Sequence, residues 1–352
     1  MKLYDHPLYR ADVSAVAALP LPWETLRDRS LLISGATGLI GRLLTDVLLL
    51  KNREGLGCVL YCLTRDPDAA VALFPADAAE YGLRLLACDV NRPLALPPTL
   101  RADYVLHLAS NTHPRQYATL PVSTITTNLL GAMRLLDYAR DVSAKRFLFA
   151  SSNEIYGENR SDRDLFAEDD CGYLDCNTLR AGYAESKRCT EALCLAYRSE
   201  YGLGVVIARL TRSFGPTLRM DDSKAASQFL KKALAGEDVV LKSEGTQYYS
   251  YTYAPDAVSG LLTVLLLGVD GEAYNVADAS CDVRLRSLAQ MFADAAGTKL
   301  RFELPDTVEA AGFSRATKAR LDGAKLRSLG WRPMYGLEAA VQRTCRILKG
   351  CD

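Results

Sequence analysis

The sequence predicts an α/β fold in which a doubly wound parallel sheet is followed by a smaller C-terminal α/β lobe. Two observations lead to this prediction. Short apolar strands alternate with amphipathic helices over about the first 210 residues, and a glycine-rich turn joins the first strand to the first helix. Strands that alternate with helices pair in parallel through right-handed crossovers. Such sheets bind their ligands at the carboxyl ends of the strands.

The first strand is predicted at Ser30–Ser34, and the helix after it has one apolar face, formed by Leu39, Ile40, Leu43, Leu44, Val47 and Leu48. Helices are also expected over 128–140 and from about Tyr183 to Tyr201. The same apolar pattern predicts five further strands, at Cys58–Leu63, Leu83–Cys88, Tyr104–Leu108, Arg146–Ala150 and Val205–Leu210.

After about residue 210, proline and glycine interrupt the chain more often, which indicates a second lobe. A helix is expected at Ser223–Leu234, and its apolar stripe is interpreted as core packing. The predicted organisation is an N-terminal extension at 1–29, a dinucleotide-binding Rossmann domain at 30–210 and a smaller lobe at 211–352. We expect the smaller lobe to be interleaved with the last strands of the sheet.

Composition excludes several classes of function. The 42 Lys and Arg residues balance 42 Asp and Glu residues, so no net charge attracts nucleic acid or an anionic membrane. No apolar run reaches the roughly 18 residues that a membrane span needs. The ten cysteines form no C-x-x-C pair, so no metal site is expected. With no apolar signal segment at the start, we expect a cytoplasmic protein with reduced thiols.

The turn after the first strand is the first motif that carries chemistry. It has the form G-x-x-G-x-x-G, in which glycine lets backbone N–H groups approach a pyrophosphate at the positive end of a helix dipole. A purely structural turn is the alternative. In this strand-to-helix context the motif predicts a dinucleotide site formed by Gly35, Thr37, Gly38, Leu39, Ile40 and Gly41.

The ends of the next two strands leave the choice of dinucleotide open. An acidic residue at the end of the second strand would bind the ribose hydroxyls of NAD, but this chain has Arg65 near that point. Arg65 could meet the 2′-phosphate of NADP, stack on adenine or face solvent. Asp89 and Val90 follow the third strand and could contact adenine, although an isolated Asp is nearly as often a turn or cap residue.

A second motif, Tyr183-x-x-x-Lys187, places a phenol and an ammonium on one helical face. The ammonium would lower the phenol pKa toward neutrality, so that Tyr183 could act as a general base. Ser152 ends a predicted strand and could share a hydrogen bond with the oxygen that Tyr183 deprotonates. Glu154 is expected to act as an acid or base, with a solvated carboxylate as the alternative.

Taken together with His107–Ser110 and Asn128, these motifs resemble the extended short-chain dehydrogenase/reductase family, also described as NAD-dependent epimerases and dehydratases. The similarity covers about residues 30 to 345. It implies a bound nicotinamide cofactor, NAD with NADP still open, and a nucleotide-sugar substrate held by the C-terminal lobe. It also implies cofactor contacts at Leu108, Ala109, Ser110 and Asn128.

Within this family, four stretches are most similar to the UDP-glucuronate decarboxylases. They are residues 107–117, 150–157, 180–188 and 215–229. The resemblance implies decarboxylation that begins with transient oxidation of the sugar at C4. The alternatives are a 4-epimerase and a dTDP-glucose 4,6-dehydratase, but dehydratases use an Asp-Glu pair where this chain has Asn153. A non-catalytic protein that senses NAD(P) is a remote alternative.

The substrate residues that the resemblance implies are Tyr117, Ser152, Asn153, Arg180, Arg219, Lys224, Tyr249 and Arg315. Similar enzymes generally have an Arg, interpreted as a pyrophosphate ligand, where this chain has Tyr249. Arg219, Lys224, Arg315 or Arg320 could supply the missing charge, and each could equally be a surface cation. The two long helices predicted at 128–140 and 183–201 could pair with those of a second copy, which predicts a homodimer.

Overall fold

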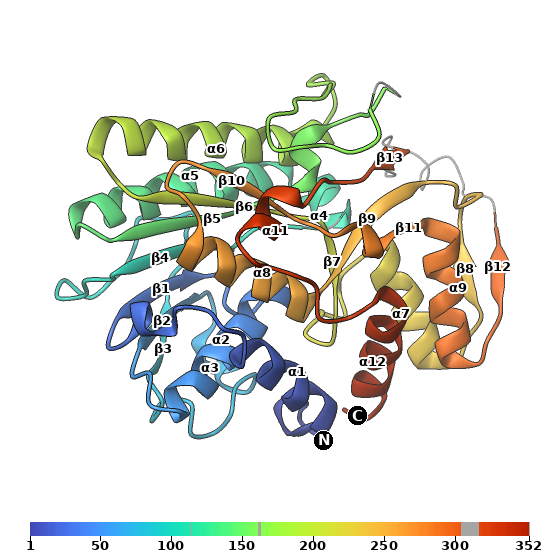
Figure 1. The fold of residues 1–352 in the computed structure, drawn as a ribbon, viewed down its shortest axis with the longest axis horizontal. Helices are drawn as coiled ribbons and strands as arrows, with labels where there is room; N and C mark the ends of the chain where they lie inside the picture. Colours follow the sequence, from blue (N-terminus) through green and yellow to red (C-terminus); the bar gives the residue numbers. More distant parts are fainter. Residues whose placement is uncertain (113, 161–162, 304–316, 352) are drawn as a thin grey trace.

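The computed structural model of the chain describes residues 1–112, 114–160, 163–303 and 317–351 (Figure 1). Its centre is a seven-stranded sheet in the order β3-β2-β1-β4-β5-β6-β10, and all neighbours in it are parallel. The predicted fold class is therefore confirmed. The strands are β1 (Ser30–Ser34), β2 (Val59–Thr64), β3 (Leu83–Ala87), β4 (Tyr104–His107), β5 (Arg146–Ser152), β6 (Val205–Leu210) and β10 (Ala273–Val276).

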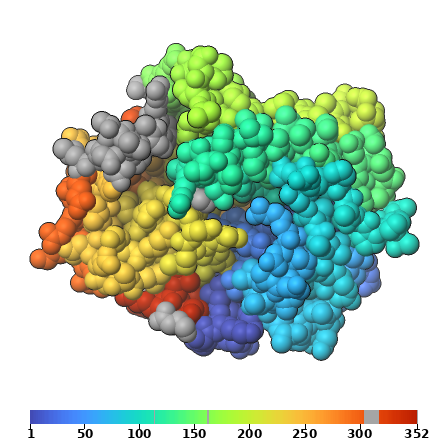
Figure 2. Space-filling view, turned by 180° about the vertical axis from the view of Figure 1, so that it is seen from behind, coloured from blue at the N-terminus to red at the C-terminus, as the bar shows by residue number. Residues whose placement is uncertain are grey.

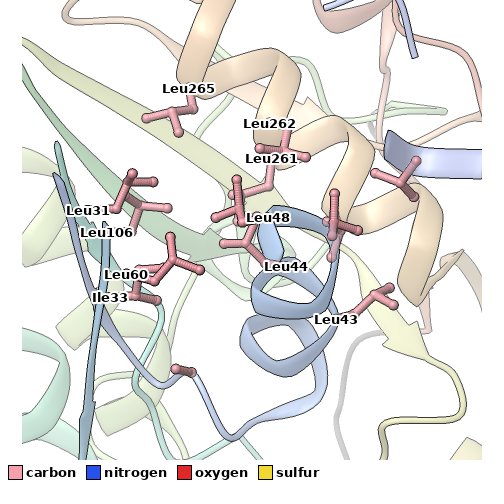
Figure 3. Packing of buried hydrophobic residues seen from close by; sticks show 14 of the residues in the cluster. Leu31, Ile33, Leu43, Leu44, Leu48, Leu60, Leu106, Leu261, Leu262 and Leu265 are labelled. Atoms are coloured by element: carbon pink, nitrogen blue, oxygen red, sulfur yellow. The ribbon is translucent and has the colours of Figure 1, made fainter. Parts of the chain in front are cut away.

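Helices cover both faces of this sheet (Figure 1). α2 (Leu39–Arg53), α8 (Ala254–Leu267) and α1 (Pro7–Ala17) pack together on one face, while α5 (Pro121–Asp141) and α6 (Ala181–Tyr201) pack together on the other. Alternate residues of a strand point to opposite faces. In β1, Leu31 and Ile33 therefore join the leucines of α2 and α8 (Figure 3), whereas Leu32 packs with the core beneath α5 and α6.

The C-terminal part of the chain builds a second, smaller group of elements at one end of the sheet (Figure 1). β7 (Arg212–Phe214), β9 (Tyr248–Tyr253), β11 (Asp282–Arg284) and β13 (Lys318–Ala319) form one small sheet, and β8 (Val239–Leu241) pairs with β12 (Leu300–Phe302). Their apolar side chains share a core with α7 (Ala225–Ala235), α9 (Leu285–Ala296) and α12 (Leu337–Lys349). This core is separate from the two beside the large sheet.

The short elements complete the chain. They are the helices α3 (Pro67–Val71), α4 (Pro114–Thr119) and α11 (Ala324–Ser328), and the 3-10 turns η1 (Leu3–Asp5), η2 (Trp23–Leu26), η3 (Asn153–Tyr156) and η4 (Ala279–Cys281). In the described ranges no helix combines the length and apolar character needed to cross a membrane. All ten cysteines fall inside those ranges, and none of them forms a disulfide.

The structure extends one predicted helix. The helix expected at 128–140 begins at Pro121, because proline is favoured in the first turn and the Thr-rich segment after it continues the helix. α4, which the sequence analysis did not predict, lies immediately before it. The helix expected at Ser223–Leu234 spans Ala225–Ala235 and ends at Gly236 in the left-handed conformation.

Candidate active site

The glycine turn between β1 and α2 is packed too closely for any larger side chain. A Cβ on Gly41 would lie 2.1 Å from the carbonyl oxygen of Gly35. Gly35 itself has a φ of +77° and lies against the backbone of Leu108 and Ala109, where an added Cβ would approach the Ala109 nitrogen to 2.6 Å. The turn therefore holds the end of β1 against the end of β4. Because its glycines have no side chains, the backbone of the turn stays uncovered.

This bare backbone fits the pyrophosphate of a dinucleotide. Gly38 is the N-cap of α2, and no side chain caps the helix there. The first N–H groups of α2 are thus left for a ligand at the positive end of the helix dipole. Thr37, Leu39 and Ile40 are half-buried in the same turn. The residues predicted from the motif are therefore brought together as one cradle.

The two strand ends beside this cradle differ from each other. Arg65 is exposed after β2, where its side chain is accessible to a ligand or to solvent. Asp89 is half-buried, and its Oδ1 accepts hydrogen bonds from the backbone nitrogen of Asn91 at 2.9 Å and from Asn91 Nδ2 at 3.2 Å. Asp89 thus has the role of a turn residue, which the sequence analysis gave as the alternative to an adenine contact. Val90 is buried and packs against Gly131 of α5.

Tyr183 lies in the first turn of α6 and is buried next to the end of β5. Its ring packs on that of Tyr117, with 4.8 Å between the centroids. Burial and the neighbouring Glu154 carboxylate raise the pKa of Tyr183 to about 12, although hydrogen bonds with Ser152 and Ser110 act in the opposite direction. Ser152 is thus placed beside the phenol as the sequence predicted, but the expected lowering of the phenol pKa is wrong for this structure.

The state of Lys187 explains in part why the pKa of Tyr183 is not lowered. Its Nζ lies 5.9 Å from the Tyr183 ring centroid and donates a hydrogen bond of 2.7 Å to the carbonyl oxygen of Ala150. The side chain is buried, and burial lowers the pKa of Lys187 to about 7. The lysine therefore carries only part of its charge near neutral pH, which weakens its effect on the phenol.

A buried hydrogen-bond network joins this pair to the end of β4. Ser110 donates to Oδ1 of Asn128 at 2.7 Å, and Asn128 Nδ2 donates to Ser186 at 2.9 Å. Ser186 in turn donates to the carbonyl oxygen of Tyr183 at 2.8 Å. Asn128, on α5, is completely buried. The network holds α5, α6 and the loop after β4 in register around Tyr183.

Glu154 is half-buried in η3, directly after β5, and forms an ion pair with Arg180, with 2.6 Å between Oε1 and Nη2. Burial alone would raise the pKa of this carboxyl group, but Arg180, with smaller effects from Arg212 and Lys224, holds the pKa below its ordinary value. The guanidinium of Arg180 also lies over the Tyr117 ring, 4.6 Å from its centroid. Glu154 is therefore an ionised, paired carboxylate rather than a solvated one.

A cavity of about 810 Å³ opens beside this ion pair, between α4 and the C-terminal elements. Figure 2 looks onto the face where α7, in yellow, meets the blue-green segment that contains α4. Among the described lining residues, Glu154 is the one carboxylate, and the cations are Arg115, Arg180, Arg212, Lys224, Lys232 and Lys242. The lining therefore has more cations than carboxylates, in a chain with no net charge.

Four predicted substrate residues line this cavity: Tyr117, Arg180, Lys224 and Tyr249. Ser152 and Asn153 are buried at the end of β5, behind the lining. Arg219 is exposed and pairs with Asp221, and Arg315 lies outside the described residues. Arg320 lies over the Tyr248 ring, 4.5 Å from its centroid, and away from the cavity lining.

The sequence analysis did not single out Arg212. It lies at the start of β7 and reaches the cavity because β7 pairs with β9, placing Arg212 opposite Tyr251 in the ladder. The only available signal was a cation immediately after the last strand predicted in the sheet, at the edge where ligands bind.

The parallel sheet, the bare glycine cradle and the buried Tyr183–Lys187 pair define a Rossmann-type dinucleotide-binding protein. Comparison with known families makes this class specific. The chain belongs to the NAD dependent epimerase/dehydratase family, whose model matches residues 31–277.

Individual relatives are identical to this chain at about a quarter to a third of the aligned residues. UDP-glucuronic acid decarboxylase 1 of Xenopus tropicalis is 29% identical over 333 residues, which cover 94% of this chain and 75% of the relative. UDP-glucuronic acid decarboxylase 5 of Arabidopsis thaliana is 29% identical over 307 residues, covering 87% and 85%. A dTDP-glucose 4,6-dehydratase of Streptomyces venezuelae, crystallised with NAD, superimposes with a TM-score of 0.76 at 26% identity and covers 90% of this chain and 96% of that one.

Proposed function

We propose that the chain binds NAD and decarboxylates UDP-glucuronate after transient oxidation of the sugar at C4. The observation that carries this proposal is the placement of Tyr183, bonded to Ser152 and Ser110, beside the Glu154–Arg180 pair at the end of a cationic cavity. A sugar bearing a diphosphate and a carboxylate matches such a cavity in charge. The relatives named as UDP-glucuronic acid decarboxylases support this choice of substrate.

The cofactor would lie along the edge formed by β1, β4 and β5. The glycine cradle would hold its pyrophosphate, and Lys187 and the Asn128 network would fix the ribose end. When bound, NAD supplies the acceptor for the hydride from C4 and the donor for its return, so there is no net oxidation. The exposed position of Arg65 supports testing NADP beside NAD.

The side chains of this site have separate tasks in the proposed reaction. Tyr183 Oη removes the proton from the sugar O4, and Ser152 orients that oxygen. Because Tyr183 is a neutral phenol in this structure, its pKa must fall when the site is loaded. Glu154 is ionised, so it serves as a base or as the partner that positions Arg180, and not as the resident acid.

The carbon chemistry follows from the 4-keto group. A uronic acid oxidised at C4 is a β-keto acid, so the C5–C6 bond breaks with its electron pair passing toward O4, and carbon dioxide leaves. Polar groups around O4 stabilise the enolate that forms. Protonation at C5 and reduction at C4 complete the conversion to a pentose.

Product analysis of the purified protein with NAD and a panel of UDP-glucuronate, UDP-glucose and dTDP-glucose tests this proposal. We expect carbon dioxide from UDP-glucuronate and a UDP-sugar lighter by that mass. A product of unchanged mass but altered configuration would instead indicate a 4-epimerase, and loss of water from dTDP-glucose a 4,6-dehydratase. Binding of NAD with no turnover of any of the three would favour a sensing protein.

We further propose a division of labour along the chain. Residues 30–210 bind the dinucleotide, residues 211–352 select the nucleotide sugar, and residues 1–29 are an N-terminal extension. The support for this division is the cavity position, since α7, β8 and β9 line it opposite α4. β10 and α8 are interleaved with the large sheet although they follow residue 210.

We also propose a homodimer formed through α5 and α6. These helices pack on each other, yet both expose large apolar side chains, namely Val122, Ile125 and Met133 on α5 and Leu195 and Tyr201 on α6. Exposed apolar surface of this kind favours association. Ten cysteines with no disulfide among them fit a reducing compartment, so we propose a cytoplasmic location.

A further inference from the structure

Arg212 lines the cavity, and its guanidinium forms no ion pair with a carboxylate of the described residues. Its Cζ lies over the ring of Tyr249, 3.7 Å from the centroid, and its Nη1 is buried with no hydrogen-bond partner. A guanidinium nitrogen buried without a hydrogen-bond partner costs free energy, and a bound anion would offset that cost.

Two other cations of the wall are already neutralised. Arg180 also rests on a tyrosine ring, but Glu154 pairs with it at 2.6 Å. Lys224 pairs with Asp222, with 3.2 Å between Nζ and Oδ2. Arg212 thus differs from Arg180 in one respect: both are stacked on tyrosine, and only Arg180 has a carboxylate partner. The charge of Arg212 is therefore available to a ligand in the cavity.

We propose that Arg212 binds the diphosphate of the nucleotide sugar and that Tyr249 is the platform that orients it. This inference rests on the proposed function. C1, which carries the diphosphate, lies across the sugar ring from C4. With C4 at Tyr183, the diphosphate points away from α6 toward the wall formed by β7 and β9, where Arg212 and Tyr249 lie. The planar fork of a guanidinium matches two phosphate oxygens.

The pairing of β7 with β9 explains how a tyrosine can stand where similar enzymes generally have an Arg. Neighbouring strands are about 4.8 Å apart, so a cation on β7 can serve the same part of the cavity as one on β9. The ring of Tyr249 holds the guanidinium of Arg212 against the wall by a cation–π contact. In this chain Arg212 on β7 supplies the charge, and Tyr249 on β9 orients it.

Calorimetric titration of the NAD-loaded protein with UDP, UDP-glucose and UDP-glucuronate tests the proposal. Arg212→Gln should weaken the binding of all three by a similar factor, about 10- to 100-fold, because all three contain the diphosphate. Arg212→Lys should recover part of the loss. Arg284→Gln is the matched control, since Arg284 also lies over a tyrosine ring of β9 but is exposed outside the cavity. It should bind all three ligands as the wild type does.

Two results would overturn the inference. In the first, Arg212→Gln binds UDP as tightly as the wild type while its melting temperature and NAD affinity are unchanged. In the second, only UDP-glucuronate binding weakens, which would assign Arg212 to the sugar carboxylate. The test of the diphosphate site can be separated from the test of the proposed reaction. If the wild type releases no carbon dioxide but Arg212→Gln still weakens UDP binding, the diphosphate site stands and only the proposed reaction fails.

Discussion

At the scale of single residues, burial outweighs the attraction between Tyr183 and Lys187. Their spacing of four residues correctly placed both side chains on one face of α6. The sequence could not show that this face is covered by Tyr117 and Phe149, which exclude water from both groups. The pKa of Tyr183 therefore rises to about 12 and that of Lys187 falls to about 7. A bound ligand must supply the interactions that reverse these shifts.

Removal of one hydroxyl tests the base. Tyr183→Phe should lower kcat by roughly 10²- to 10⁴-fold, the range associated with a general base, while NAD and UDP still bind. Rapid-quench product analysis and NAD titration measure the two effects separately. Tyr81→Phe, in the loop before β3, serves as the control and should keep full activity. Turnover near the wild-type rate in Tyr183→Phe would rule out the mechanism.

The lowered pKa of Lys187 also predicts a pH-dependent stability. The folded-state pKa of about 7 lies below the usual 10.5, so between these values the unfolded chain holds the extra proton. Stability from this group therefore rises with pH over that window and is lost as pH falls toward 7. Lys187→Met should remove this dependence, which amounts to about 3–5 kcal/mol across the window.

Urea unfolding of nucleotide-free protein at pH 6.5, 8 and 9.5, roughly spanning that window, measures the effect. The stability of wild type minus that of Lys187→Met should increase with pH, a difference that cancels the titration of buried tyrosines and cysteines. Lys145→Met, an exposed lysine before β5, should follow the wild type. A constant difference between wild type and Lys187→Met would show that Lys187 is charged throughout.

At the scale of elements, local patterns predicted most of the large sheet and none of the contacts between distant strands. Apolar runs identified β1 to β6 within a few residues. β6 ends at Leu210 and β7 begins at Arg212, yet the two strands belong to different sheets. The local sequence could not predict this change, because β7 pairs with β9, which begins some 36 residues later. The position of Arg212 in the cavity depends on that pairing, so residue periodicity alone could not reveal it.

The homodimer proposed to form through α5 and α6 gives a prediction at this scale. Light scattering should report twice the chain mass of 38.5 kDa for the wild type. Leu195→Glu together with Met133→Glu places charges on both exposed faces and should yield monomers, because burying an unpaired carboxylate in an interface is costly. Val71→Glu, an exposed apolar position on α3, should leave the mass unchanged. A monomeric wild type would contradict the proposal.

At the scale of the whole molecule, folding separates charges that balance along the sequence. The chain has 42 acidic and 42 basic residues, yet the described cavity lining contains six cations and a single carboxylate. Composition gave no reason to expect nucleic-acid binding, and it could not show where the cations gather. That depends on α4 lying beside the consecutive elements β7, α7 and β8, which follow it by more than 90 residues in the chain.

The N-terminal helix α1 contacts both the large sheet's helices and the smaller C-terminal group of elements. α1 packs on α2 and α8 beside the large sheet, and its Asp12 is completely buried. Asp12 accepts hydrogen bonds from Tyr253, at the end of β9, and from Arg343, on α12. A single carboxylate thus connects the extension to β9, whose Tyr249 and Tyr251 line the cavity, and to the C-terminal helix.

Loss of that carboxylate should be costly. Asp12→Ala leaves Arg343 and Tyr253 without their partner and should lower the free energy of unfolding by about 3 kcal/mol, since removing one member of a buried ion pair strands the other charge. Asp12→Asn keeps the volume and an acceptor for Tyr253, so it should lose less. Asp5→Ala, at an exposed position of the same extension, is the control. Equal urea midpoints for Asp12→Ala and Asp5→Ala would mean that the extension only covers the core and that packing alone holds the two lobes together.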